Sequence, residues 1–140
     1  MEREIQRVKR RLDEYYYWEK SVAELQEKIE QLQYVKEGVK GVGFETVHGI
    51  PETMESKIIR LGEMQDALEA EIDRTEIEMS QIRGELGMDL LEGNEREMVE
   101  MIHRDRKTYE QVADALGYAG KGVVWRKMQK IYGGMANLSE

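Results

Sequence analysis

The sequence predicts an all-α protein, in which a long antiparallel coiled-coil hairpin is followed by a small module of three helices. Three observations lead to this fold class. Apolar residues recur three and four positions apart over two long stretches, a glycine-rich segment separates these stretches, and short segments with helix start and stop signals follow residue 93. The 140 residues suit one compact domain or a small module carried on an extended helical element.

The first apolar series predicts a long amphipathic helix near the beginning of the chain. Its members are Ile5, Val8, Leu12, Tyr15, Trp18, Val22, Leu25, Ile29 and Leu32. The consecutive aromatic residues from Tyr15 to Trp18 cannot all face one side, because successive helical residues point about 100° apart. We expect at least one of them near the surface. These aromatic residues either form an oligomer or partner interface or pack against the loop around Phe44 or against the three-helix module.

The second apolar series predicts a coiled-coil helix, and a loop over residues 37–51 joins it to the first. That loop reads EGVKGVGFETVHGIP, with four glycines and the only proline of the chain. The series alternates steps of four and three through Met54, Ile58, Leu61, Gln65, Leu68, Ile72, Thr75, Met79, Ile82 and Leu86. Residues 1–88 are therefore expected to form an antiparallel hairpin. Because a hairpin covers each apolar seam only in part, we expect a homo-oligomer, a dimer or a tetramer.

A separate three-helix module is expected over residues 94–134. Gly87 and Gly93 interrupt the apolar series, and Asn94 followed by Glu97 has the form of a capping box. The apolar face of this first helix is formed by Met98, Met101 and Ile102. Thr108 and Gln111 form a second capping-box pattern, before a helix whose inward residues are Val112, Ala113 and Leu116 and whose stop is Gly117.

The third helix of the module is predicted from about Gly120 to Tyr132. Its inward positions are Val124, Met128, Ile131 and Tyr132, with Val123 or Trp125 at the margin. A helix, a tight glycine-containing turn and a helix bearing cations are typical of a helix-turn-helix (HTH) unit that binds duplex DNA. The candidate DNA-contacting residues are Lys121, Gly122, Arg126, Lys127, Gln129 and Lys130. Lys and Arg attract phosphates, and Arg, Lys and Gln also bond base edges.

The distribution of charge supports a local cationic surface on an acidic chain. The net charge is -8, yet residues 1–94 hold 13 Lys and Arg against 22 Asp and Glu, whereas residues 95–140 hold 8 against 7. With no cysteine and only His48 and His103, we expect no metal site and no cofactor. Neither a catalytic carboxylate arrangement nor a phosphate-cradling glycine motif is present, so we expect no enzyme activity. No apolar run is long enough to span a membrane, which favours a cytoplasmic protein.

The segment TYEQVADALGY, followed by a valine and a basic helix, resembles region four of bacterial sigma factors. With the segment PETMESKIIRLGEM, the chain from about Ile29 to Ile131 looks like the small phage-encoded, sigma-like regulators of the ArpU/RinA kind found in prophages of Gram-positive bacteria. The resemblance implies a bacterial host, recognition of promoter-type DNA, activation of late genes and contact with host RNA polymerase, without a cofactor. It also implies a contact role for Lys121 and scaffold roles for Tyr109, Glu110, Val112, Ala113, Leu116, Gly117 and Val123.

Two other functions fit the same pattern. The small terminase subunit of a phage DNA-packaging machine also joins an HTH to an oligomerising helical hairpin, and it would assemble from eight or more subunits. An acidic adaptor that binds proteins through its long helices would show no salt-sensitive DNA binding.

Overall fold

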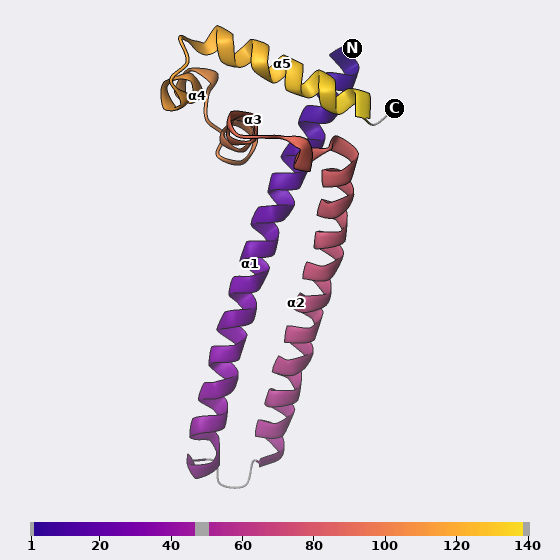
Figure 1. Ribbon diagram of the computed structural model, residues 1–140. Helices are drawn as coiled ribbons and strands as arrows, with labels where there is room; N and C mark the ends of the chain where they lie inside the picture. Colours follow the sequence, from indigo (N-terminus) through magenta and orange to yellow (C-terminus); the bar gives the residue numbers. More distant parts are fainter. Residues whose placement is uncertain (1, 47–50, 139–140) are drawn as a thin grey trace. The chain divides into compact units, whose positions relative to one another are not determined.

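The computed structural model describes the backbone of residues 2–46 and 51–138, and the side chains of residues 2–38 and 55–138. This part of the chain is all-α, which confirms the predicted fold class. The elements in order are α1 (Glu2–Thr46), α2 (Pro51–Leu86), the 3-10 turn η1 (Met88–Leu90), α3 (Asn94–Val99), the π-helical turn η2 (Glu100–Arg104), α4 (Tyr109–Leu116) and α5 (Lys121–Leu138) (Figure 1).

The chain divides into two compact units. One consists of Lys20–Ile77 and is called the hairpin unit below. The other combines Met1–Glu19 with Glu78–Glu140 and is called the HTH unit. The predicted module of residues 94–134 is thus part of a larger unit, to which the beginning of α1 and the end of α2 also contribute.

The hairpin unit contains antiparallel stretches of α1 and α2 (Figure 1). Leu25, Leu61 and Ile72 are buried along the seam. Between the two helices, the Lys36 ammonium donates a hydrogen bond of 3.4 Å to the side-chain oxygen of Gln65. The predicted apolar series therefore faces the partner helix, with the polar seam residue Gln65 bonded across it.

The loop predicted for residues 37–51 is wrong over residues 37–46, because α1 continues to Thr46. Glycine costs a helix roughly 1 kcal/mol against alanine, but each added residue of a growing helix also gains a backbone hydrogen bond. A long helix can therefore continue through isolated glycines. The rest of the predicted loop before Pro51, including His48, lies outside the described residues, as do the side chains of Phe44 and Met54.

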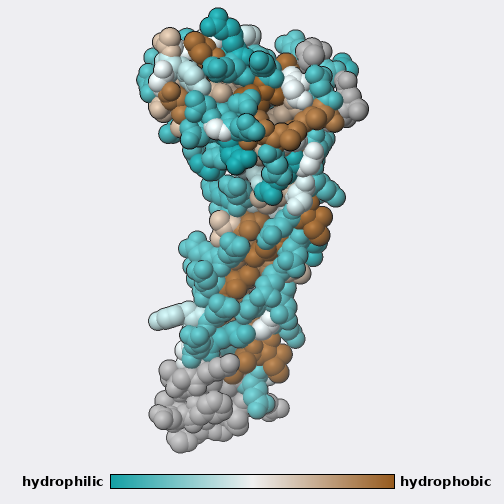
Figure 2. Space-filling view, viewed as in Figure 1, coloured by the Kyte–Doolittle hydropathy of each residue, from teal (hydrophilic) through white to brown (hydrophobic). Residues whose placement is uncertain are grey.

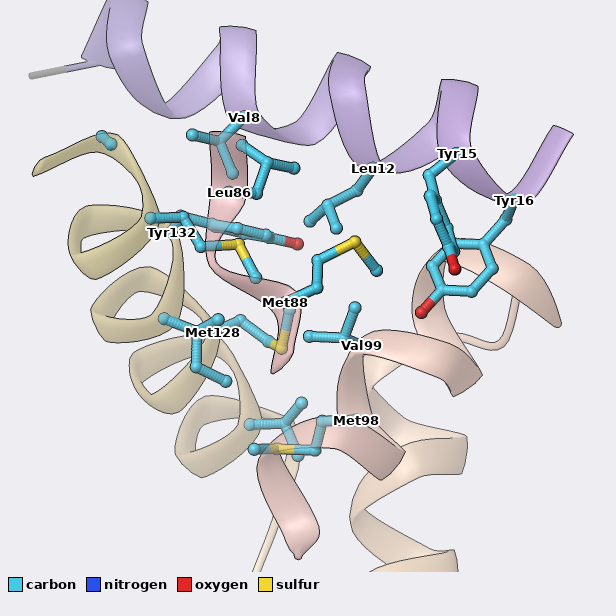
Figure 3. Close-up of a cluster of buried hydrophobic side chains, with 14 of the residues drawn as sticks. Val8, Leu12, Tyr15, Tyr16, Leu86, Met88, Met98, Val99, Met128 and Tyr132 are labelled. Atoms are coloured by element: carbon cyan, nitrogen blue, oxygen red, sulfur yellow. The ribbon is translucent and has the colours of Figure 1, made fainter. Parts of the chain in front are cut away.

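A buried apolar core holds the HTH unit together, and each of the helices α1 to α5 contributes buried side chains to it. Figure 3 shows side chains of α1, such as Val8 and Leu12, facing those of α5, such as Met128 and Tyr132. The core residues of this unit are Val8, Leu12, Tyr15, Tyr16, Ile82, Leu86, Met88, Met98, Val99, Val112, Ala113, Val124, Met128, Ile131, Tyr132, Met135 and Ala136.

The aromatic run of α1 divides between the core and the surface. Tyr15 and Tyr16 are buried in the core of the HTH unit, their rings meeting edge to face with centroids 5.1 Å apart. Trp18 is half-buried against the same core, and Tyr17 is exposed. The guanidinium of Arg83 donates a hydrogen bond to the Tyr15 hydroxyl. Of the two readings of this run, packing within the chain accounts for Tyr15 and Tyr16.

Two details of the predicted module need correction. The helix predicted at Asn94 does begin there, but its N-cap is Gly93 and no side chain caps it. The Asn94 amide instead donates to the Tyr118 hydroxyl at 3.2 Å. The last helix, predicted to end near Tyr132, continues to Leu138, because Met135 and Ala136 extend its buried face by a further turn.

Candidate nucleic-acid interface

The tight turn between α4 and α5 is fixed by local signals at both ends of α4. Thr108 caps α4 as predicted: its hydroxyl accepts from the Gln111 N–H at 3.1 Å, and the Gln111 side chain accepts from the Thr108 N–H at 2.9 Å. At the other end Gly117 has φ of 76°, a left-handed conformation that glycine adopts at little cost. The N–H of Tyr118 then bonds the carbonyl of Ala113 at 2.9 Å, and the chain re-enters a helix at Lys121.

Helix α5 has one buried face and one exposed face, and the division follows the predicted pattern. Val124, Met128, Ile131 and Tyr132 are buried. Five of the six candidate contact residues are exposed, namely Lys121, Gly122, Arg126, Lys127 and Lys130, and Gln129 is half-buried. The structure thus brings all six onto the part of α5 that the core leaves uncovered.

The four cationic side chains of α5 form no ion pair with a carboxylate of the described residues. Within residues 2–38 and 55–138, the ion pairs join other side chains, and no carboxylate pairs with Lys121, Arg126, Lys127 or Lys130. The neighbouring helix α4 is different, because its exposed residues include Glu110 and Asp114. The positive surface of α5 therefore does not continue over these residues of α4.

The cations fall into two groups. Lys127 and Lys130 line a hollow of about 320 Å³ together with Glu92, just before α3, and Glu95, in the first turn of α3. The Lys127 ammonium also lies 5.3 Å from the centre of the Tyr118 ring, at cation–π distance. Acidic neighbours reduce the local potential at this pair. Lys121 and Arg126 do not line that hollow, so we assign them the stronger attraction for an anion.

Trp125 is a candidate contact residue that the sequence placed only at the margin of the core. Its side chain is 52% exposed, next to Arg126 and one turn away from Lys121 and Gln129. An exposed tryptophan among cations supplies an apolar surface that can contact thymine methyl groups in the major groove. The signal that could have found it is its spacing, four residues after Lys121 and four before Gln129.

The back of α5 is fixed by a buried polar chain centred on His103. This residue is only 6% exposed, with Nδ1 2.8 Å from an Asp13 carboxylate oxygen and Nε2 2.8 Å from the Tyr132 hydroxyl. The Arg106 guanidinium donates to the same Asp13 oxygen at 3.2 Å. The burial of His103 makes it part of the support that joins α1, η2 and α5.

The protonation states of this chain follow from burial. Burial lowers the pKa of His103, and the nearby Asp13 carboxylate opposes that effect only in part. Burial raises the pKa of Tyr132, so its phenol stays protonated. The phenol O–H then donates a hydrogen bond to Nε2 of His103. Nδ1 then carries the hydrogen and donates to Asp13. A neutral imidazole thereby satisfies both partners.

The described residues hold no cluster of three or more histidine, cysteine or acidic side chains arranged to bind a metal ion. Among the described helices, none combines the length and apolar character that a membrane span requires. Comparisons with protein-family models, with curated proteins and with solved structures each found no match.

Proposed function

We propose that this protein is a DNA-binding transcriptional regulator that contacts duplex DNA with the exposed face of α5. One observation carries the proposal: a helix that follows a tight glycine turn presents Lys121 and Arg126 outward, with no ion pair to any described carboxylate. An HTH unit places its second helix in the major groove, and unpaired cations there are available to phosphates and base edges.

The roles within the surface follow from side-chain chemistry. Lys121 and Arg126 attract phosphates most strongly, and Lys127 and Lys130, at the edge of α5 facing α3, add weaker phosphate contacts beside Glu92 and Glu95. Lys121, Arg126 and Gln129 supply directed hydrogen bonds to bases, and Gly122 lets the backbone approach a phosphate closely. Trp125 adds an apolar contact to bases beside them.

A single α5 supplies few cations, so one copy binds DNA weakly and its affinity falls as salt rises. We therefore include self-association in the proposal, because two linked copies bind with a higher effective concentration. The resemblance to phage sigma-like regulators adds control of late genes, contact with the host RNA polymerase and a place in the bacterial cytoplasm.

The test is selection of genomic DNA fragments by the purified chain. Wild-type protein is expected to retain a limited set of fragments, and a Lys121→Ala, Arg126→Ala, Lys130→Ala triple variant is expected to lose them. The matched control, Lys57→Ala, Arg60→Ala, Arg74→Ala, removes three exposed cations of α2 and is expected to keep the same set. Equal retention by both triple variants would rule out α5 as the contact surface.

The purified protein and the DNA fragments that it retains also distinguish a transcriptional regulator from a DNA-packaging protein. A dimer or tetramer that protects promoter-containing fragments from nuclease supports the regulator. A ring of eight or more subunits that selects packaging-type sites favours a small terminase subunit instead. Absence of any salt-sensitive DNA binding favours the acidic adaptor.

A further inference from the structure

An apolar groove lies along the helical pair of the hairpin unit. It has a volume of about 500 Å³, and its apolar lining includes Leu32, Val35, Met64 and Leu68. Figure 2 shows apolar surface between the two helices, bordered by polar side chains. Val35 is 41% exposed and Met64 is 47% exposed, although both are large apolar residues.

The sequence register explains why the hairpin cannot close this groove. Leu32 and Leu68 belong to the seam where α1 and α2 meet, yet both are only half-buried. Val35 and Met64 lie next to the seam and widen the apolar stripe beyond what one facing helix covers. Exposed contiguous apolar surface on a helical pair is typical of an interaction surface.

The two walls of the groove carry opposite charges. Lys28 stands on the α1 wall and Glu71 on the α2 wall, and both are exposed. In the described part of the chain neither takes part in an ion pair. A surface that would complement this groove therefore has an acid opposite Lys28, a base opposite Glu71 and apolar residues between them.

We propose that a second copy of this chain occupies the groove, related to the first by a two-fold axis parallel to the helices. Such an axis keeps each residue at its level and places α1 of one copy beside α2 of the other. Lys28 of each copy then meets Glu71 of the other, and Val35 meets Met64. A two-fold interface requires this kind of self-complementary patch, and the product is a four-helix bundle.

The two-fold axis determines how the two copies are arranged. The hairpin units run in the same direction, so equivalent residues of the two copies lie at the same end of the bundle. A flexible thioether such as Met64 suits the centre of the contact, because it adapts its shape to the partner. The inference concerns self-association alone and does not depend on DNA binding.

Charge reversal followed by mixing tests the pairing. The full-length variants Lys28→Glu and Glu71→Lys are each expected to dissociate about tenfold more readily than the wild type in sedimentation equilibrium without DNA, because each sets like charges against one another twice. In an equimolar mixture the two variants are expected to form heterodimers in native mass spectrometry. Pairing within one chain cannot produce this result, because each variant chain still carries like charges.

Apolar substitutions supply a second measurement with a matched control. Val35→Glu and Met64→Glu are expected to yield monomers, while Ile59→Glu, at a 61% exposed apolar residue that does not line the groove, keeps the wild-type mass. Circular dichroism of all three variants is expected to show wild-type helicity. A monomeric wild type, unchanged mass in Val35→Glu and Met64→Glu, or a mixture without heterodimers would overturn the proposal.

Discussion

The Nε2 atom of His103 lies 2.8 Å from the hydroxyl oxygen of Tyr132, and both residues are buried. This hydrogen bond joins the π-helical turn η2 to the inner face of the helix that carries the candidate DNA contacts. On the other side of the imidazole, Asp13 connects the pair to α1. The position of α5 is thus fixed by residues about ninety positions apart in the sequence.

Replacing the central imidazole is expected to weaken the HTH unit. His103→Ala leaves the Tyr132 hydroxyl and the Asp13 carboxylate without this partner and opens a cavity, and an unsatisfied buried polar group costs about 1–3 kcal/mol. The free energy of unfolding, measured with urea, should fall by at least that amount. Glu97→Ala, at an exposed position nearby, is the control and should stay within about 0.5 kcal/mol of wild type.

His103 is also expected to make stability depend on pH. Its pKa in the folded protein is lowered from the ordinary 6.5 by burial, with Arg106 and Lys9 adding to that effect and Asp13 opposing it. The unfolded chain therefore takes up a proton at a higher pH than the folded chain. The contribution of neutral His103 to the free energy of unfolding is complete above pH 6.5, the ordinary pKa. It is lost as the pH falls from 6.5 to the lower pKa of the folded protein.

The measurement is urea unfolding at a series of pH values between 5 and 8. The stability difference between wild type and His103→Gln should be largest above pH 6.5 and should shrink toward acid, because glutamine does not titrate. A constant difference across this range would contradict the assignment of a neutral, buried imidazole.

The contribution of α1 to the HTH unit gives a third prediction. Leu12 is fully buried in the same core as Met128, so Leu12→Ala should destabilise the unit by about 2–5 kcal/mol and weaken DNA binding with it. Tyr17→Ala changes a residue of the same helix that is 63% exposed, and it should leave both properties close to wild type. Urea unfolding and fluorescence anisotropy on a retained DNA fragment measure the two effects. Equal stability of the two variants would mean that α1 is not part of this core.

The helical periodicity of the sequence predicted which residues face inward, but not which element covers them. The apolar spacing predicts that Val8 and Leu12 share one face of the first helix, and the core that buries them also contains side chains of α5. Spacing along one helix determines only on which side of that helix the apolar residues lie. The partner on that side depends on contacts between residues far apart in the chain, which no local pattern encodes.

Local chemistry explains which parts of the candidate site could be predicted. The Thr108 cap and the Gly117 stop depend on neighbours within four residues, and the structure confirms both. The Asn94 cap failed because the helix already begins at Asn94, after the N-cap residue Gly93, and the Asn94 amide donates to Tyr118, 24 residues away. The sequence predicted a marginal core position for Trp125, because it does not show how far the other helices extend over α5.

The left-handed turn at Gly117 gives a fourth prediction. A side chain there must adopt φ of 76°, which costs roughly 1–2 kcal/mol for an L-residue, so Gly117→Ala should lower the unfolding free energy by about that amount. No atom lies near the added methyl group, so the effect isolates the backbone conformation. Gly120→Ala is the control, because Gly120 has no positive φ and its surroundings are equally open. Equal stability of the two variants would show that the turn does not require glycine.

Trp125 provides a test of DNA recognition that leaves folding unchanged. Its side chain is 52% exposed, so Trp125→Ala should change the unfolding free energy by no more than about 0.5 kcal/mol. In the major groove of a duplex an apolar side chain contacts thymine methyl groups, so loss of this contact should lower the affinity for a retained fragment by about fivefold, or ~1 kcal/mol. Trp125→Phe should recover part of the loss because it restores an apolar ring. The salt dependence of binding should stay as in wild type, since no cation is removed. Unchanged affinity of Trp125→Ala, with Arg126→Ala weakened, would restrict the contact surface to the cations.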